Sequence, residues 1–189
     1  AKAAGLNNVL VTNGLVNEKP LLELLPYIDA MNVDVKSIEN DFYKNVCFGE
    51  LAPVLRTVEL GYRHKVHIEL TNLVIPTLND SRKNFEDLRD WVSDHVGPLV
   101  PLHFSRYFPM YKLSIPSTPV SKLEEARAVA RERLKYVYIG NVGGGDWDNT
   151  RCPGCGTLLI ERSGYTTRVA GIKEGKCAKC ARSVDIVCR

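Results

Sequence analysis

Two Cys-x-x-Cys pairs near the C-terminus constrain this chain more than any other feature of its sequence. They are Cys152 with Cys155 and Cys177 with Cys180, and 21 residues separate them. Four thiolates in two such turns can surround one ion tetrahedrally at about 2.3 Å and leave no coordination position open for a substrate. We therefore expect these four cysteines to hold a structural zinc ion.

The segment between the two pairs predicts a β-hairpin. Residues 157–160 and 165–169 are rich in β-forming residues, and Ser163 and Gly164 supply a turn between them. Two disulfides are the alternative, but no N-terminal segment resembles a signal peptide, and in a reducing compartment such pairs more often bind metal. A zinc ribbon over residues 151–189 is the favoured interpretation.

Composition predicts a soluble, cytoplasmic protein with one main domain before the ribbon. The 189 residues are 44% hydrophobic, enough for a buried core, and no apolar run approaches the length of a membrane span. The net charge of +3 is uneven, because residues 151–189 carry eight Lys or Arg against three Asp or Glu. Such a basic segment could contact RNA or an acidic partner, but it also balances the negative charge of a zinc tetrathiolate centre, which we favour.

Residues 1–142 alternate between strand and helix patterns. We predict strands at 8–12, 30–35, 65–76, 102–107 and 136–139, and helices at 20–27, 37–45, 52–61, after 81 and at 121–133. Gly61 is expected to end the third helix, Ser81 to cap the fourth, and Ser121 with Glu124 to form a capping box. The glycines at 143–145 begin a linker, over 143–150, into the ribbon.

This alternation indicates an α/β fold with mostly parallel strands, because parallel neighbours need crossover helices. An open doubly wound sheet and part of a (β/α) barrel both fit. Polar residues at successive strand ends favour the barrel, in which that rim carries the active site. The rim residues that we single out are Thr12, Asn13, Gly14, Asp34, Lys36, Thr71, Asn72, His103, Arg106, Gly140 and Asn141.

The ordered motifs resemble those of radical S-adenosylmethionine (radical SAM) enzymes of the pyruvate formate-lyase-activating type. The matching segments are Val-Thr-Asn-Gly-Leu at 11–15, Asn-Val-Asp-Val-Lys at 32–36, Leu-Val-Ile-Pro at 73–76 and Asn-Asp-Ser at 79–81. The likeness is strongest to the radical SAM enzyme of the AmmeMemoRadiSam system. It continues through residues 102–107, 111–113, 138–142, 149–150 and 158–162, and so covers almost the whole chain.

The resemblance implies reductive cleavage of S-adenosylmethionine (SAM) at a [4Fe–4S] cluster, which gives a 5′-deoxyadenosyl radical that abstracts hydrogen from a substrate. It implies SAM contacts for Thr12, Asn13, Asp34 and Lys36. His103, Arg106 and Tyr107 are weaker candidates for contact with SAM or the substrate. A lysine can hold the methionyl carboxylate, and an aspartate can hold the amine or the ribose hydroxyls. The substrate is unknown, and a protein is one candidate.

The CxxxCxxC motif that ligates the cluster in radical SAM enzymes does not occur in these 189 residues. The ribbon cysteines have a different spacing and leave no open iron for SAM. We therefore expect the chain to be the C-terminal portion of such an enzyme, inactive alone, with the cluster supplied by a missing N-terminal half of the barrel. A split enzyme and a degenerate one remain alternatives.

Two further functions fit the sequence. A non-catalytic module could bind RNA or a protein partner, with RNA contacts at Arg162, Arg168, Lys173 and Lys179, although we do not expect nucleic acid as the main partner. A cluster-free aldolase or isomerase would need a general base, for which His103 is the rim candidate.

Overall fold

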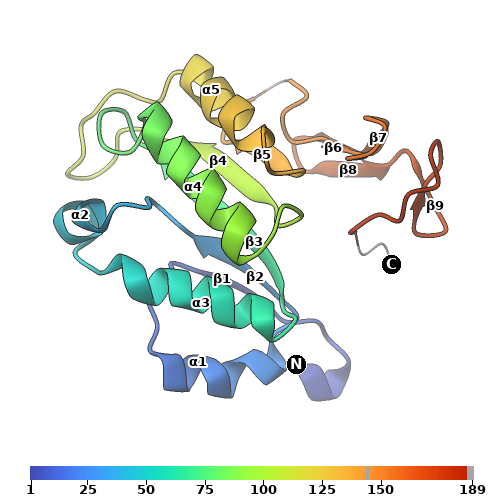
Figure 1. The fold of residues 1–189 in the computed structure, drawn as a ribbon, viewed down its shortest axis with the longest axis horizontal. Coiled ribbons are helices and arrows are strands. Elements are labelled where there is room, and N and C mark those ends of the chain that lie inside the picture. The colour runs from blue at the N-terminus through green and yellow to red at the C-terminus, as the bar shows by residue number, and fades with distance from the viewer. Residues whose placement is uncertain (144, 187–189) are drawn as a thin grey trace.

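The computed structural model describes residues 1–143 and 145–186, and its main body is one parallel sheet backed by helices (Figure 1). Five strands pair in the order β1-β2-β3-β4-β5, all parallel. Their bounds are Val9–Thr12 (β1), Ala30–Asp34 (β2), His67–Val74 (β3), Leu102–Arg106 (β4) and Val137–Gly140 (β5). The five predicted strands are therefore confirmed to within three residues at each end.

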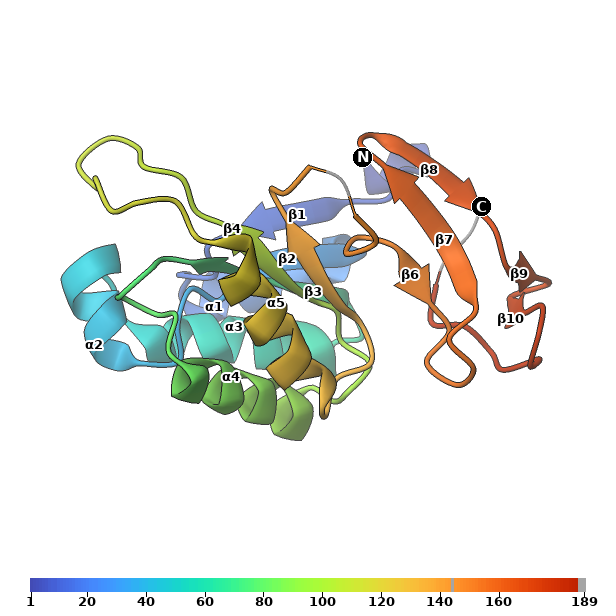
Figure 2. The same cartoon turned by 90° about the horizontal axis from the view of Figure 1, so that it is seen from above.

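The helices lie on one face of this sheet (Figure 2). Their bounds are Glu18–Leu24 (α1), Asn40–Phe42 (α2), Leu51–Arg63 (α3), Arg82–His95 (α4) and Val120–Arg131 (α5). A doubly wound sheet reverses its strand order and places helices on both faces. Sequential order with helices on one face is instead the arrangement of a barrel wall, so the structure favours the second of the two predicted architectures.

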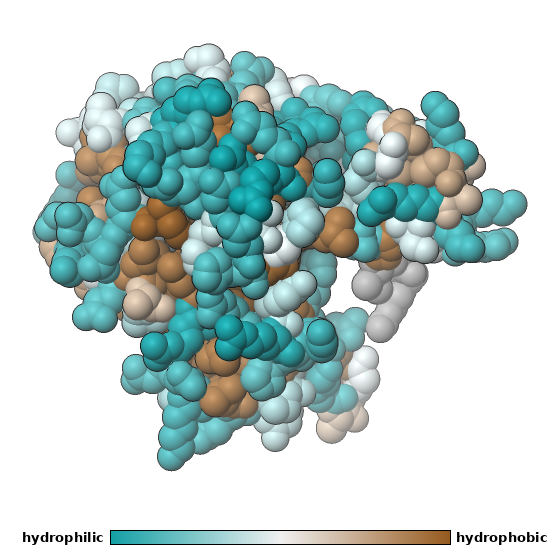
Figure 3. Space-filling model, viewed as in Figure 1, coloured by the Kyte–Doolittle hydropathy of each residue, from teal (hydrophilic) through white to brown (hydrophobic). Residues whose placement is uncertain are grey.

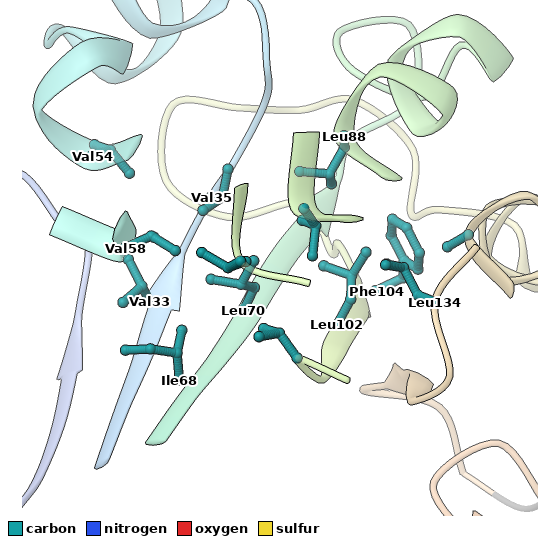
Figure 4. Close-up of a cluster of buried hydrophobic side chains, with 14 of the residues drawn as sticks. Val33, Val35, Val54, Val58, Ile68, Leu70, Leu88, Leu102, Phe104 and Leu134 are labelled. Carbon is teal, nitrogen blue, oxygen red and sulfur yellow. The ribbon is translucent and has the colours of Figure 1, made fainter. Parts of the chain in front are cut away.

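Strand alternation builds the core between the sheet and the helices. On β2 to β5 every second side chain is buried, among them Val33, Leu70, Leu102 and Phe104 (Figure 4). Phe104 meets Phe85 of α4 edge to face, with ring centroids 5.6 Å apart. Each such side chain contributes about 1.5–3 kcal/mol by leaving water. The alternate residues point to the opposite side, which we call the helix-free face.

The first strand is a free sheet edge. Among the described residues β1 pairs only with β2, and two of its side chains, Val9 and Val11, are 65% and 77% exposed. Exposed apolar side chains beside unpaired backbone groups are a template for further strand pairing. One side of β1 is thus available for pairing with another strand.

Two predicted helix signals are wrong. Helix α3 continues past Gly61 to Arg63, and a Cβ at position 61 would lie 2.8 Å from the side chain of Ile68 on β3. Gly61 therefore permits close packing of helix on strand and does not end the helix. At α5 the N-cap is Pro119 with no side-chain cap, so the predicted capping box of Ser121 and Glu124 does not form. The cap at Ser81 is confirmed, because its hydroxyl accepts from the backbone N–H of Asn84.

The helix predicted over 37–45 is short and irregular. Helix α2 covers three residues and passes into a π-helical turn over Tyr43–Cys47, which ends at Phe48 in the left-handed conformation. The Tyr43 hydroxyl accepts from the backbone N–H of Lys36, and the turn therefore supports the chain just after β2.

The C-terminal region forms a small antiparallel unit beside β5 (Figure 1). Its strands are Thr150–Arg151 (β6), Leu158–Ser163 (β7), Thr166–Val169 (β8), Ile172–Lys173 (β9) and Lys176–Cys177 (β10). The β7–β8 pair is the predicted hairpin. A hydrogen bond between the Tyr138 and Thr150 hydroxyls joins this unit to β5, and Tyr136, just before β5, donates to Asp185. The predicted boundaries at 142, 150 and 189 stay predictions, and residues 144 and 187–189 lie outside the described residues.

Candidate functional site

The four ribbon cysteines converge on one point. Their sulfur atoms all lie within 4.8 Å of one another, and the pairs Cys152–Cys180 and Cys155–Cys177 are each 3.6 Å apart. A disulfide needs about 2.05 Å, whereas four sulfurs around one ion at about 2.3 Å are separated by about 3.8 Å. The cluster therefore fits a single tetrahedrally bound metal ion and does not fit two disulfides.

The two Cys-x-x-Cys turns have the same backbone hydrogen bonds. Cys152 donates to the carbonyl of Thr157 and accepts from Gly156, and Cys177 likewise donates to Arg182 and accepts from Ala181. Gly156 and Ala181 occupy the same place in their turns, and both are left-handed, with φ of 73° and 59°. The matching turns place the two sulfur pairs symmetrically around the centre.

The pKa values of Cys155 and Cys180 are shifted in opposite directions. Hydrogen bonds from the side chain and backbone of Thr157 lower the pKa of Cys155 to about 6. The pKa of Cys180 is raised to about 11. The backbone N–H of Arg182 favours the thiolate and so lowers the pKa, but the neighbouring Cys155 sulfur and burial together raise it by more. Four thiolates at this spacing require a cation among them.

The rim residues Asp34 and Lys36 lie together at the end of β2. Lys36 Nζ is 2.8 Å from Asp34 Oδ2, and about a third of each side chain is exposed. The backbone of Lys36 is held on both sides, because Asn79 Nδ2 donates to its carbonyl and its N–H donates to Tyr43. The carboxyl end of the sheet therefore carries an ion pair whose backbone is held in place.

Three other predicted rim residues form hydrogen bonds within the loops that follow their strands. Thr12 Oγ1 accepts from the N–H of Gly14, and Asn13 Oδ1 accepts from that of Leu15, which shapes the turn after β1. Arg106, at the end of β4, donates from Nε to the carbonyl of Thr118, and its guanidinium lies 4.8 Å from the Phe108 ring. These contacts leave the roles of Thr12, Asn13 and Arg106 in SAM binding as predictions.

His103 does not lie at the rim. It is the second residue of β4, and on the helix-free face its Nε2 donates to Glu69 at 2.8 Å while its ring stacks on Tyr138 at 4.9 Å. Glu69 also accepts from His67 at 3.3 Å. Hydrogen bonds from His103 and then from His67 hold the pKa of Glu69 well below its usual range, and the hydrogen bond to Glu69 raises the pKa of His67.

Sequence reasoning missed this cluster. One sequence pattern could have indicated it. His67, Glu69 and Thr71 occupy alternate positions of β3, which places three polar side chains on one face. The second signal is register, because His103 pairs with Thr71 and Tyr138 pairs with His103. The residues of β3, β4 and β5 come together only through the strand pairing. A single sequence does not reveal that pairing.

This chain is similar in sequence to a longer curated protein. No protein-family profile matches the chain. An uncharacterized protein of Methanocaldococcus jannaschii is 44% identical over 191 residues, which are 99% of this chain and 56% of that protein. The chain thus spans little more than half the length of this curated relative.

Three solved structures share the fold at low sequence identity. A domain of the pyruvate-formate lyase-activating enzyme from Bacteroides vulgatus has a TM-score of 0.64 and 11% identity, over 74% of this chain and 84% of that one. A radical SAM methyltransferase from Sphaerobacter thermophilus has a TM-score of 0.58 and 16% identity, over 79% and 43%. Streptococcus suis SuiB bound to S-adenosylmethionine has a TM-score of 0.56 and 9% identity, over 70% and 32%. The predicted radical SAM-like α/β fold is confirmed.

Among the described residues, none of the helices combines the length and apolar character that crossing a bilayer requires.

Proposed function

We propose that this chain is the C-terminal portion of a radical SAM enzyme, related to the activating type and specifically to the AmmeMemoRadiSam system. The observation that carries the proposal is the run of five parallel strands in sequential order with helices on one face. That arrangement is a barrel wall and is similar to the radical SAM folds above. The complete enzyme would cleave SAM reductively in the cytoplasm and pass the radical to a substrate, for which a protein is one candidate.

The cluster would come from the part of the protein that precedes this chain. No CxxxCxxC occurs in the sequence, and four of the six cysteines form the ribbon centre. The free edge of β1, with Val9 and Val11 exposed, offers a place for preceding strands. The M. jannaschii relative is long enough to contain them, since this chain covers 56% of it.

The activity test compares the chain alone with a longer protein. After reconstitution with iron and sulfide, the chain alone should release no 5′-deoxyadenosine from SAM. Joined to an N-terminal half that contains CxxxCxxC, it should release the product when a reductant is added. Product from the chain alone would contradict the proposed location of the cluster, and a joined protein that assembles its cluster but leaves SAM intact would contradict the proposed activity.

Asp34 and Lys36 are the residues that we assign to SAM binding. Because they form an ion pair, another ion pair of the chain can serve as the control. In the joined protein, Asp34→Asn and Lys36→Met should each weaken SAM binding tenfold to a hundredfold, about 1.5–3 kcal/mol for a charge-assisted hydrogen bond. The ion pair of Lys122 and Glu125 is a matched control, with the same 2.8 Å separation and nearly the same exposure. Lys122→Met should leave SAM affinity unchanged. If all the variants bind SAM with equal affinity, the ion pair of Asp34 and Lys36 has only a structural role.

The ribbon metal that we propose is zinc, at one ion per chain. Four sulfur ligands with no open position suit a closed structural site. Metal analysis of the purified chain should give one zinc, lost in Cys152→Ser. Iron at one atom per chain would identify the centre as an iron site.

The RNA-binding alternative has less support from the described contacts. Arg162 donates to Thr150 and to the carbonyl of Asp148, and Arg168 pairs with Glu161. Lys173 and Lys179 are exposed. Nucleic-acid affinity that falls steeply with salt and depends on these two lysines would support the alternative.

A further inference from the structure

A cavity lies mainly toward the end of the sheet where β1, β2 and β3 begin, away from Asp34 and Lys36. It has a volume of about 640 Å³, in the range of small-molecule sites. The first residues of β1, β2 and β3 line one side, together with His103 and Tyr138, and the ribbon residues Asp148, Thr150, Ile160 and Arg162 line the other. In the space-filling view, an open gap separates the ribbon from the lower part of the main body (Figure 3).

The floor of this cavity carries a fixed negative charge. Glu69 is ionised, because the hydrogen bonds from His103 and His67 favour its carboxylate form. A carboxylate has about four acceptor positions, and these two imidazoles use two of them. The side chain of Glu69 is 37% exposed, so the remaining positions are open to the cavity.

The ribbon wall carries two charges of opposite sign that have no ionic partner within residues 1–143 and 145–186. The half-buried carboxylate of Asp148 has no hydrogen bond or ion pair among the residues that the structure describes. The Arg162 guanidinium donates from Nη1 to Thr150 Oγ1 and to the carbonyl of Asp148, and it lies 5.8 Å from the Tyr138 ring. It pairs with no carboxylate in the same described part of the chain, so its Nε and Nη2 remain for a ligand.

The other two acidic residues of the cavity are engaged. Asp29 forms an ion pair with Lys2, and Asp185 accepts from Tyr136. Most of the remaining lining is apolar or aromatic, namely Val9, Pro101, Tyr136, Ile139, Ile160 and Ile186. A complementary ligand therefore has a positive group, a negative group and an apolar part.

We propose that this cavity binds a zwitterionic small molecule of the α-amino acid class with an apolar or aromatic side chain. Its ammonium group would contact Asp148 and Glu69, and its carboxylate would contact Arg162. Its side chain would pack against Tyr138 and Ile160. Asp34 and Lys36, to which SAM is assigned, do not line this cavity, and the proposal does not depend on the proposed function.

The test uses three probes of one shape on the metal-loaded chain. L-phenylalanine carries both charges, phenethylamine only the positive one and 3-phenylpropanoate only the negative one. Calorimetry or amide NMR shifts should show L-phenylalanine binding at least about tenfold more tightly than either analogue, because each analogue loses one charge-assisted contact. An analogue that binds as tightly as L-phenylalanine, or the absence of binding by all three, overturns the proposal.

Variants locate the binding site. Asp148→Asn and Glu69→Gln should each weaken L-phenylalanine binding about tenfold, as should Arg162→Gln. The control Arg168→Gln lies on the same hairpin, is paired with Glu161, and should have no effect. Because Arg162 also donates to the β6 segment, Arg162→Lys provides a variant that keeps the charge, and metal content reports folding of the ribbon. Unchanged binding in folded Asp148→Asn overturns the assignment. Asp34→Asn should leave L-phenylalanine binding intact, which distinguishes this site from the SAM site.

Discussion

The sheet region encloses a continuous core between strands and helices. In the ribbon, the buried hydrophobic cluster among the described residues contains only Leu159 and Ile160 with two cysteines, Cys152 and Cys177. Hydrophobic burial can hold the first region together, because it scales with the apolar area removed from water. The second region has too little apolar area for this and must rely on its metal. One chain therefore contains two units with different sources of stability.

The largest expected effect is selective loss of the ribbon. Cys177→Ser, or removal of the metal by a chelator, should unfold the residues from about 151 onward and leave the sheet folded. Binding of structural zinc supplies about 10–16 kcal/mol in small zinc domains. Amide NMR would show random-coil shifts confined to the ribbon.

Cys47→Ser is the matched control, because Cys47 is a half-buried free cysteine of the main body. It should leave the metal content and the ribbon spectrum unchanged. Cooperative loss of the sheet together with the ribbon in Cys177→Ser would show that the two units are one.

The reciprocal change should destabilise the sheet without affecting the metal centre. Phe104 is fully buried, and Phe104→Ala should lower the free energy of unfolding of the sheet by about 3–5 kcal/mol. Tyr165→Ala at the exposed tip of the hairpin should change stability by less than about 0.5 kcal/mol. Denaturant titration followed by Trp91, which packs against the main core, measures the first effect, and metal stoichiometry should stay at one.

A smaller effect concerns pH and the cluster of Glu69 on the helix-free face. The lowered pKa of Glu69 adds stability above its unfolded pKa of about 4.3, which is lost as the pH falls through the folded value. The raised pKa of His67 adds stability below about 6.5, which is lost as the pH rises through its folded value. The stability difference between the wild type and Glu69→Gln should therefore be largest between about pH 4.3 and 6.5. Denaturant midpoints measured across pH that give a constant difference would contradict this.

The smallest effect tests the two matching turns of the metal centre. Ala181 is left-handed where the first turn has Gly156, and such a conformation costs a residue with a Cβ about 1–2 kcal/mol. Ala181→Gly should stabilise the metal-loaded ribbon by about 0.5–1 kcal/mol after the entropy of the unfolded chain is counted. Gly156→Ala should destabilise it similarly, since a Cβ there meets no atom within 4 Å and only the backbone strain counts. Competition with a metal indicator measures both.

Local signals in the sequence predicted most elements of this fold. The Cys-x-x-Cys spacing identified the metal centre, the apolar runs identified the strands, and Ser81 identified the start of α4. Each of these depends on residues that are close in sequence, and neighbouring strands here also follow one another in sequence.

Signals that depend on distant partners were missed or misread. Gly61 resembled a helix end, but its role is set by Ile68 on β3. Ser121 and Glu124 matched a capping box, yet α5 begins two residues too early for it to form, with Pro119 at the N-cap position. His103 was assigned to the rim, and the register with Thr71 places it beside Glu69 and Tyr138 instead. The ligand cavity needs the ribbon packed beside the sheet, which no local pattern encodes.

The sequential strand order has a consequence for how the protein is made. During synthesis each strand from β2 to β5 emerges directly after a strand that it pairs with, so β2 finds β1 available, and β3 then finds β2. None of these four strands has to be inserted between two that have already paired. The ribbon emerges after β5, the strand that it packs against. A ribosome-bound chain can therefore assemble the sheet step by step before the ribbon cysteines bind their metal.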